Sequence, residues 1–215
     1  MKNNDELFRD LTARLSGLDY IHPEEIPGID LYMDQVTTFM EQHLEHSKRY
    51  PEDKVLTKTM INNYAKNNLL PPPEKKKYSR EHMLTLIFIY YYKNLLSIGD
   101  IQTLLKPITD RYFQAPSGLC LTDIYEELFS LERSQLNCLE EEARKAYETA
   151  SQTFAQAPES ERELLQRFAF ICLLGFDVYM KKHIIELLID DIAAGEKESK
   201  DGRPKKSTKK NREEE

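Results

Sequence analysis

Few glycines, few cysteines and no long apolar run set this sequence apart from several large classes of protein. Its 7 glycines in 215 residues argue against a β-sandwich or a β-barrel, because those folds use glycine at many of their turns. Its 3 cysteines are an odd number at wide spacing, which excludes a disulfide framework and a Cys-x-x-Cys zinc site. We therefore expect Cys120, Cys138 and Cys172 to be reduced core residues of a cytoplasmic protein.

Membrane, secretory and enzymatic signals are missing as well. The most apolar stretches, residues 83–92 and 168–176, are much shorter than the roughly 20 residues that cross a bilayer. The charged N-terminus has no apolar segment of the signal-peptide kind, so we expect neither a membrane protein nor a secreted one. No glycine-rich phosphate loop, nucleophile elbow or paired-histidine metal motif is present, so we expect no enzyme and no cofactor.

The one pair of neighbouring histidines does not make a metal site. His43 and His46 lie three residues apart, with Glu41 and Glu45 beside them. Two imidazoles on a surface helix without further ligands are usually solvated, and we expect no bound metal here.

The sequence does contain apolar residues at three- and four-residue spacing along most of its length, which predicts an all-α fold. Proline, glycine and charge divide this pattern into four parts. They are an N-terminal helix and loop (1–29), a domain of short helices (30–110), an acidic hairpin of two long helices (119–194) and a disordered tail (195–215). The hairpin helices are separated by Pro158, and a hairpin with so strong an apolar stripe usually packs on a third element or on a second copy of itself.

Within the second part, capping residues predict where the short helices begin and end. A first helix should run from Asp30 to the Tyr50-Pro51 pair. Thr57 should begin a second helix, which Asn67-Asn68 should end in a left-handed turn. Ser79 should begin a third, largely buried helix. A fourth should run from Ser97 to Pro107.

Charge is unevenly distributed along the chain. The formal net charge is −7, which taken alone argues against binding to nucleic acid. Residues 54–110, however, contain nine Lys and Arg against four acidic residues, whereas residues 111–195 contain eight against fifteen. A basic stretch is thus embedded in an acidic protein, and it includes the capped helix at Thr57 and the run Lys75-Lys76-Lys77.

Residues 55–82 have the layout of a winged helix-turn-helix: a capped helix, a sharp stop, an extended Leu-Leu-Pro-Pro, a basic loop and a second capped helix. In such a domain the recognition helix presents polar side chains to the major groove, and the basic loop neutralises phosphates. Asparagine can bind adenine with two hydrogen bonds. The candidate DNA contacts are Lys58, Asn62, Asn63, Lys66, Lys75, Lys76, Lys77, Tyr78 and Arg80.

This segment resembles the DNA-binding domain of the MerR family over about residues 53–106. The matching positions are Thr57 at the cap, Ile61 and Tyr64 in the helix, Asn68 for a glycine, the turn Leu69-Leu70-Pro71, the helix entry Tyr78-Ser79 and the later segment 95–101. The resemblance implies a short β-wing and DNA binding. Asn62 and Asn63 depart from it, because the MerR family has an Arg and a Tyr there that touch the DNA backbone. Through the segments 60–64 (Met-Ile-Asn-Asn-Tyr) and 71–82 (Pro-Pro-Pro-Glu-Lys-Lys-Lys-Tyr-Ser-Arg-Glu-His), the chain is also similar, over much of its length, to an uncharacterised bacterial family of unknown function.

These observations lead to one main hypothesis and two others. The main hypothesis is a transcriptional regulator that binds duplex DNA as a homodimer. The second, which the departure at Asn62 and Asn63 favours, is a protein-interaction module that keeps the helix-turn-helix scaffold and docks an acidic partner. The third is a small-molecule effector site in the C-terminal hairpin.

Overall fold

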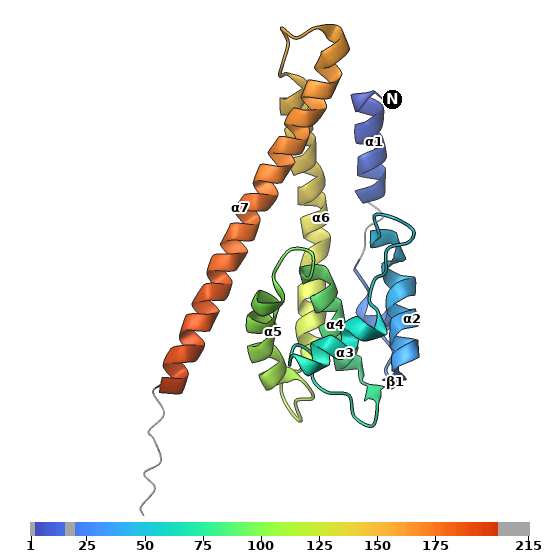
Figure 1. The fold of residues 1–215 in the computed structure, drawn as a ribbon, viewed down its shortest axis with the longest axis vertical. Helices are drawn as coiled ribbons and strands as arrows, with labels where there is room; N and C mark the ends of the chain where they lie inside the picture. The colour runs from blue at the N-terminus through green and yellow to red at the C-terminus, as the bar shows by residue number, and fades with distance from the viewer. Residues whose placement is uncertain (1–2, 16–19, 202–215) are drawn as a thin grey trace, which may run out of the picture.

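The computed structural model describes residues 3–15 and 20–201, and nearly all of its regular elements are helices (Figure 1). The helices are α1 (Asn4–Leu15), α2 (Met33–Leu44), α3 (Lys58–Lys66), α4 (Arg80–Tyr92), α5 (Ile98–Tyr112), α6 (Leu121–Ser151) and α7 (Glu159–Asp201), with short 3₁₀ turns η1 (Pro23–Glu25) and η2 (Glu45–Ser47). Two strands, β1 (Leu31–Tyr32) and β2 (Lys77–Tyr78), pair antiparallel. The predicted all-α class is confirmed.

A first hydrophobic core fills the lower half of the molecule in Figure 1, around α4. Every residue from His82 to Ile87 is buried, because this helix is apolar on more than one face. The segment before β1 and the first turns of α6 close the same core, since the Tyr125 hydroxyl donates to the Ile21 carbonyl at 2.6 Å. Arg80 closes it from the other side, donating to the Pro23 carbonyl at 2.7 Å.

Three predicted helix ends in this region are confirmed. The Thr57 hydroxyl accepts the Met60 N–H at 3.2 Å, and Ser97 likewise caps α5. Asn68, just after α3, adopts a φ of 56°. This left-handed conformation ends the helix, and asparagine tolerates it because its side chain is short and polar.

Three other predicted ends are wrong. Helix α2 begins at Met33 rather than at Asp30, because Leu31 and Tyr32 form strand β1. Helix α2 ends at Leu44, and the 3₁₀ turn η2 follows it well before Pro51. Helix α5 continues through Pro107 to Tyr112, although proline removes one helical hydrogen bond. The continuation lets Ile108 and Phe113 pack on the first core, and this burial outweighs the lost bond.

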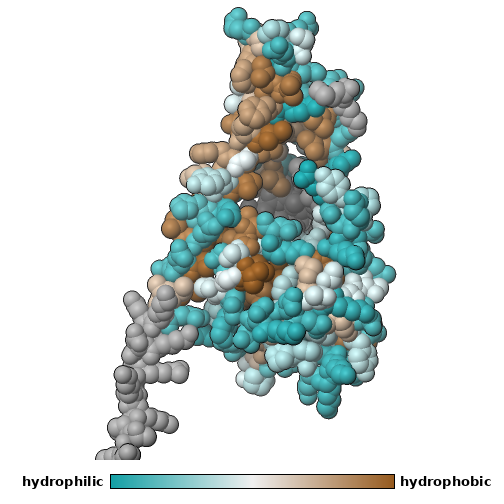
Figure 2. All heavy atoms as spheres, viewed as in Figure 1, coloured by the Kyte–Doolittle hydropathy of each residue, from teal (hydrophilic) through white to brown (hydrophobic). Residues whose placement is uncertain are grey.

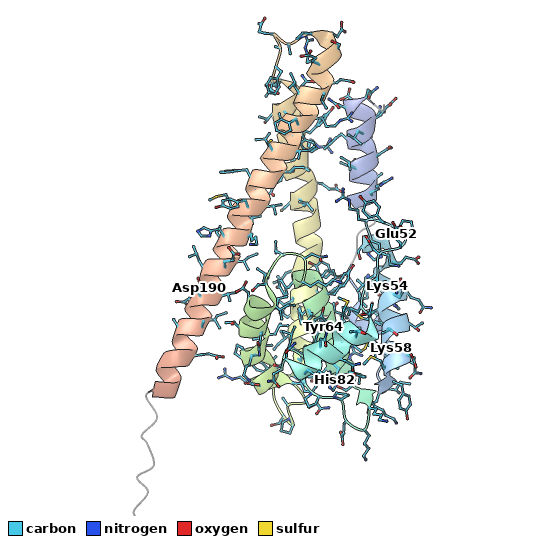
Figure 3. All side chains as sticks on the ribbon, in the orientation of Figure 1. Glu52, Lys54, Lys58, Tyr64, His82 and Asp190 are labelled. Atoms are coloured by element: carbon cyan, nitrogen blue, oxygen red, sulfur yellow. The ribbon has the colours of Figure 1, made fainter. Side chains whose placement is uncertain are left out.

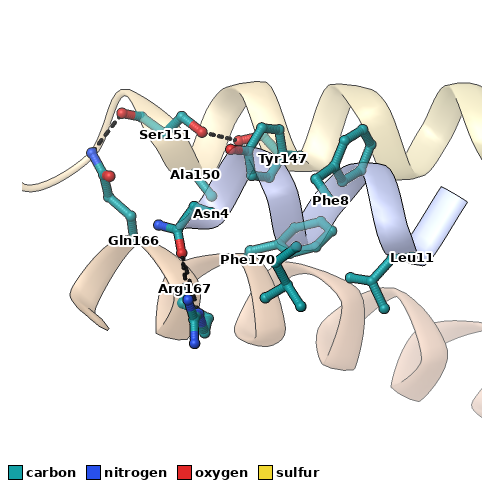
Figure 4. Close-up of a pocket in the computed structure, with 10 residues that line it drawn as sticks. Asn4, Phe8, Leu11, Tyr147, Ala150, Ser151, Gln166, Arg167 and Phe170 are labelled. Atoms are coloured by element: carbon teal, nitrogen blue, oxygen red, sulfur yellow. Dashed lines mark hydrogen bonds between the residues drawn. The ribbon is translucent and has the colours of Figure 1, made fainter. Parts of the chain in front are cut away.

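A second, smaller core joins α1 to the upper end of the α6–α7 hairpin (Figure 4). Phe8 stacks on Tyr147, with ring centroids 4.4 Å apart, and meets the edge of Phe170. Arg167 donates to the side-chain oxygen of Asn4 at 3.0 Å. The predicted N-terminal helix therefore packs against the hairpin, and residues 16–19, which follow it, lie outside the described part of the chain.

Helices α6 and α7 pack along each other as a hairpin, but the end of α7 and two of the cysteines differ from the prediction. Helix α7 continues to Asp201, past the predicted start of the tail at Gly195, and residues 202–215 lie outside the described part. Cys138 and Cys172 are exposed rather than buried, because they lie on helix faces that no described part of the chain covers. Among the described residues, no helix is long and apolar enough to cross a membrane.

Candidate nucleic-acid interface

Helix α3 packs on the first core through one face and leaves the other in solvent. Ile61 and Tyr64 are buried beneath it, so the spacing of 3.6 residues per turn turns the polar residues outward. The exposed residues are Lys58, Thr59, Asn62, Asn63 and Lys66. Nothing acidic occurs in α3, so this face offers amide, hydroxyl and ammonium groups only.

A groove of about 460 Å³ runs between α2 and the start of α3. Its basic residues, Lys54 and Lys58, are labelled in Figure 3. Its one acid, Glu41, accepts a hydrogen bond from Lys48, and this bond lowers the pKa of the Glu41 carboxyl. Lys58 forms an exposed ion pair with Asp34 of α2. Exposed pairs of this kind contribute little free energy, so the ammonium can exchange partners.

The predicted basic wing is a tight turn that leads into β2. The Lys77 N–H donates to the Glu74 carbonyl at 2.8 Å, and the two residues between them, Lys75 and Lys76, adopt φ values of 47° and 66°. Positive φ at both central positions is typical of a two-residue hairpin turn, where Asn-Gly is the favoured pair. Both lysines are exposed.

The pairing of β1 with β2 decides where the next two candidate DNA contacts, Lys77 and Tyr78, point. Lys77 lies opposite Tyr32, and Tyr78 lies opposite Leu31. Because side chains alternate across a strand, the Lys77 ammonium lies 5.4 Å from the centre of the exposed Tyr32 ring. Tyr78 instead enters the core and is only 3% exposed. Its prediction as a DNA contact is therefore wrong.

Arg80 is the second predicted contact that the structure corrects. Its guanidinium donates to the carbonyls of Pro23 and Ile26, at 2.7 and 3.2 Å. These bonds hold the segment before β1 against the start of α4, and a backbone carbonyl cannot be exchanged for phosphate without loosening the fold. Arg80 is a structural residue rather than a surface cation.

A buried histidine fixes the chain just before the basic turn. The Ser79 N–H donates to Nδ1 of His82 at 3.0 Å, so the proton of the neutral ring is on Nε2, which lies 3.3 Å from the Pro72 carbonyl. Burial lowers the pKa of His82, because the imidazolium form loses its hydration. His82 is the third residue of a Ser-capped helix, a capping-box position that could have been read from the sequence.

We call the outward face of α3, the turn from Glu74 to Lys77, and the adjoining Lys54 and Tyr32 the α3–turn surface. Its elements lie at one end of the molecule in Figure 1. Sequence reasoning found Lys58, Asn62, Asn63, Lys66 and the three lysines of the turn, but it missed Lys54 and Tyr32 as members. Within residues 3–15 and 20–201, no cluster of His, Cys, Asp and Glu is suited to hold a metal ion.

A family model described as a domain of unknown function, DUF1836, matches residues 21–129. The chain belongs to the DUF1836 family. The matched region of this DUF1836 protein begins at Ile21 and ends just after Tyr125, the two residues whose hydrogen bond closes the first core. It contains the whole α3–turn surface. No curated protein and no solved structure matches the chain. The comparisons give no support to the MerR resemblance, which stays a prediction.

Proposed function

We propose that the DUF1836 domain binds duplex DNA through the α3–turn surface and regulates transcription without enzymatic activity. The observation that carries this proposal is the outward face of α3. It presents Asn62 and Asn63 between Lys58 and Lys66, with no carboxylate among them. Such a face suits base edges and phosphates together.

The dimensions of the surface agree with the proposal. Helix α3 has nine residues and is about 13 Å long at about 1.5 Å per residue, which fits within the major groove of B-DNA. In this position the side-chain amides of Asn62 or Asn63 meet adenine edges. Lys75 and Lys76, at the tip of the turn, neutralise phosphates on the flanking strand. This is how the wing of a MerR-like domain would act.

One such helix makes few base contacts, so the proposed binding unit is a dimer on two half-sites. The acidic hairpin supports selectivity, because its negative charge limits non-specific attraction to the DNA backbone.

The competing function is a protein-interaction module for an acidic partner. Two observations favour it. Asn62 and Asn63 replace the Arg and Tyr of the MerR pattern, and the exposed ion pair with Asp34 shows that a carboxylate fits beside the Lys58 ammonium. A protein partner with carboxylates could use the same lysines without reading bases.

The deciding experiment is a pull-down of genomic fragments by the full-length protein, followed by sequencing. We expect an enriched sequence motif that Asn62→Ala alters. The matched control, Asn94→Ala, changes an exposed asparagine outside the surface and should leave the motif unchanged. No enrichment at any salt concentration would contradict DNA binding and favour the interaction module.

A further inference from the structure

Helix α7 contains a long apolar segment that no other part of the described chain covers. All ten residues from Ile171 to Met180 are exposed. The segment reads Ile-Cys-Leu-Leu-Gly-Phe-Asp-Val-Tyr-Met, with a single charge at Asp177. Phe176 and Tyr179 are 66% and 64% exposed. Ten consecutive residues go around the helix more than twice, so the exposure is not confined to one side.

The segment is exposed because the buried residues that hold α7 to the rest of the chain, its two anchors, lie on either side of the segment. Phe170 belongs to the second core and Ile189 to the first. These are the buried residues of α7 among those with described side chains. They are nineteen positions apart, or about 28 Å along the helix. Between them α7 diverges from α6 and leans toward α5, as Figure 1 shows.

The facing helix has an apolar stripe of its own. Leu128, Leu131 and Leu139 of α6 are 48%, 55% and 41% exposed, and their spacing places them on one side of the helix. Figure 2 shows hydrophobic side chains gathered over the hairpin, whereas the lower half of the molecule is largely hydrophilic. The hairpin therefore exposes apolar side chains on both of its helices, the 171–180 segment of α7 and the leucine stripe of α6.

The size of this surface corresponds to a stable protein interface. Seven large apolar residues of the 171–180 segment and the three leucines of α6 are between 37% and 66% exposed. At roughly 150–200 Å² per large side chain, they leave about 750–1,000 Å² of apolar area in solvent. A typical monomer has patches of only about 300–600 Å², and a stable complex buries about 800 Å² per partner.

The charges around the segment point to an apolar partner. The carboxylate of Asp177 accepts from the Lys181 ammonium at 2.9 Å, and the same ammonium lies 3.1 Å from Glu142 of α6. The one acid of the segment is thus already paired within the chain. A highly charged partner would find nothing complementary there.

We propose that a second copy of this chain covers the 171–180 segment. Two hairpins related by a two-fold axis form a four-helix arrangement in which each α7 packs on the partner's α7 and on the leucine stripe of the partner's α6. Gly175 lies in the middle of the segment, and a Cβ added there would meet nothing within 4 Å. Its missing side chain lets the two helices approach closely. This inference does not depend on DNA binding.

The first test is the mass of the full-length protein in solution, measured by analytical ultracentrifugation from about 1 to 100 μM. We expect twice the chain mass of 25.3 kDa. Phe176→Lys should raise the dimer dissociation constant at least about 30-fold, and circular dichroism should show that its helix content is unchanged. The matched control is Ile29→Lys, at a 71% exposed site away from the hairpin, which should remain dimeric.

A second measurement uses no lysine variant. Cys172 is exposed in the single chain, so its rate of alkylation reports whether the segment is covered. We expect Cys172 of the wild-type protein to react several-fold more slowly than Cys172 of a Phe176→Ser variant, which weakens the dimer without adding a charge beside the thiol. A monomer at about 100 μM, equal dissociation constants for the two lysine variants, or equal alkylation rates would each overturn the proposal. None of these assays contains DNA, so they cannot fail for lack of DNA binding.

Discussion

The turn before β2 allows the proposed DNA contact to be separated from the stability of the fold. Lys75 and Lys76 adopt φ values of 47° and 66°, and a left-handed conformation costs an ordinary residue about 1 kcal/mol or more. Asn-Gly adopts this turn with little strain. Replacing Lys75→Asn together with Lys76→Gly should therefore raise the free energy of unfolding by about 1 kcal/mol, after allowing for the extra freedom of glycine in the unfolded chain.

The same double variant removes two exposed cations from the α3–turn surface. If each lysine neutralises one phosphate, the slope of log affinity against log salt should become shallower by about 2. The variant would then be a more stable protein that binds DNA more weakly. Thermal unfolding followed by circular dichroism measures the first effect, with an expected rise of about 2–4 °C for a chain of this size. Fluorescence anisotropy of an enriched DNA fragment at several salt concentrations measures the second.

A matched variant separates strain from charge. Lys75→Gln with Lys76→Gln removes both charges and keeps two ordinary residues at positive φ, so we expect the shallower salt slope without the gain in stability. An Asn-Gly variant that is no more stable than wild type would refute the argument from strain. A salt slope that neither double variant changes would remove the turn from the proposed interface.

Two further predictions concern the elements that position this surface. Burial lowers the pKa of His82 below 6.5, so the unfolded chain binds more protons in acid and the free energy of unfolding should fall as the pH drops below about 6.5. His82→Gln should lessen that fall in urea titrations compared at about pH 7.5 and about pH 5.5, and an equal fall in both proteins would assign it to other groups. Thr57→Ala removes the acceptor for the Met60 N–H and should lower the free energy of unfolding, measured in urea, by about 1 kcal/mol. Thr57→Ser keeps a hydroxyl acceptor and should lose only a small part of that free energy. A loss as large in the serine variant would point to packing of the methyl group.

Local chemistry explains why the helix ends at Thr57, Asn68 and Ser97 could be predicted. Each depends on a side chain that bonds to, or tolerates, the backbone beside it. The end predicted at Pro107 failed for the opposite reason. Proline weakens a helix locally, but Ile108 and Phe113 gain contacts with a core built from distant parts of the chain. Helix periodicity does not contain that information.

The same distinction applies to the candidate site. The helical spacing of the apolar residues Ile61 and Tyr64 was enough to predict that Asn62, Asn63 and Lys66 point outward. Tyr78 was misplaced because its orientation depends on pairing with a two-residue strand more than forty positions earlier, and so short a strand leaves no alternation to read. Arg80 was misplaced because its acceptors are backbone carbonyls, which have no sequence signature.

The two anchors of α7 also restrict how the length of this helix can change. Each residue added between Phe170 and Ile189 would turn the far half of the helix by about 100° and advance it by about 1.5 Å. One added residue would swing Ile189 away from the first core, whereas seven would nearly restore its direction while moving it about 10 Å along the axis. Between its anchors, α7 acts as a spacer of fixed phase and fixed length. Insertions and deletions are therefore far easier to accommodate beyond Ile189 than within this stretch.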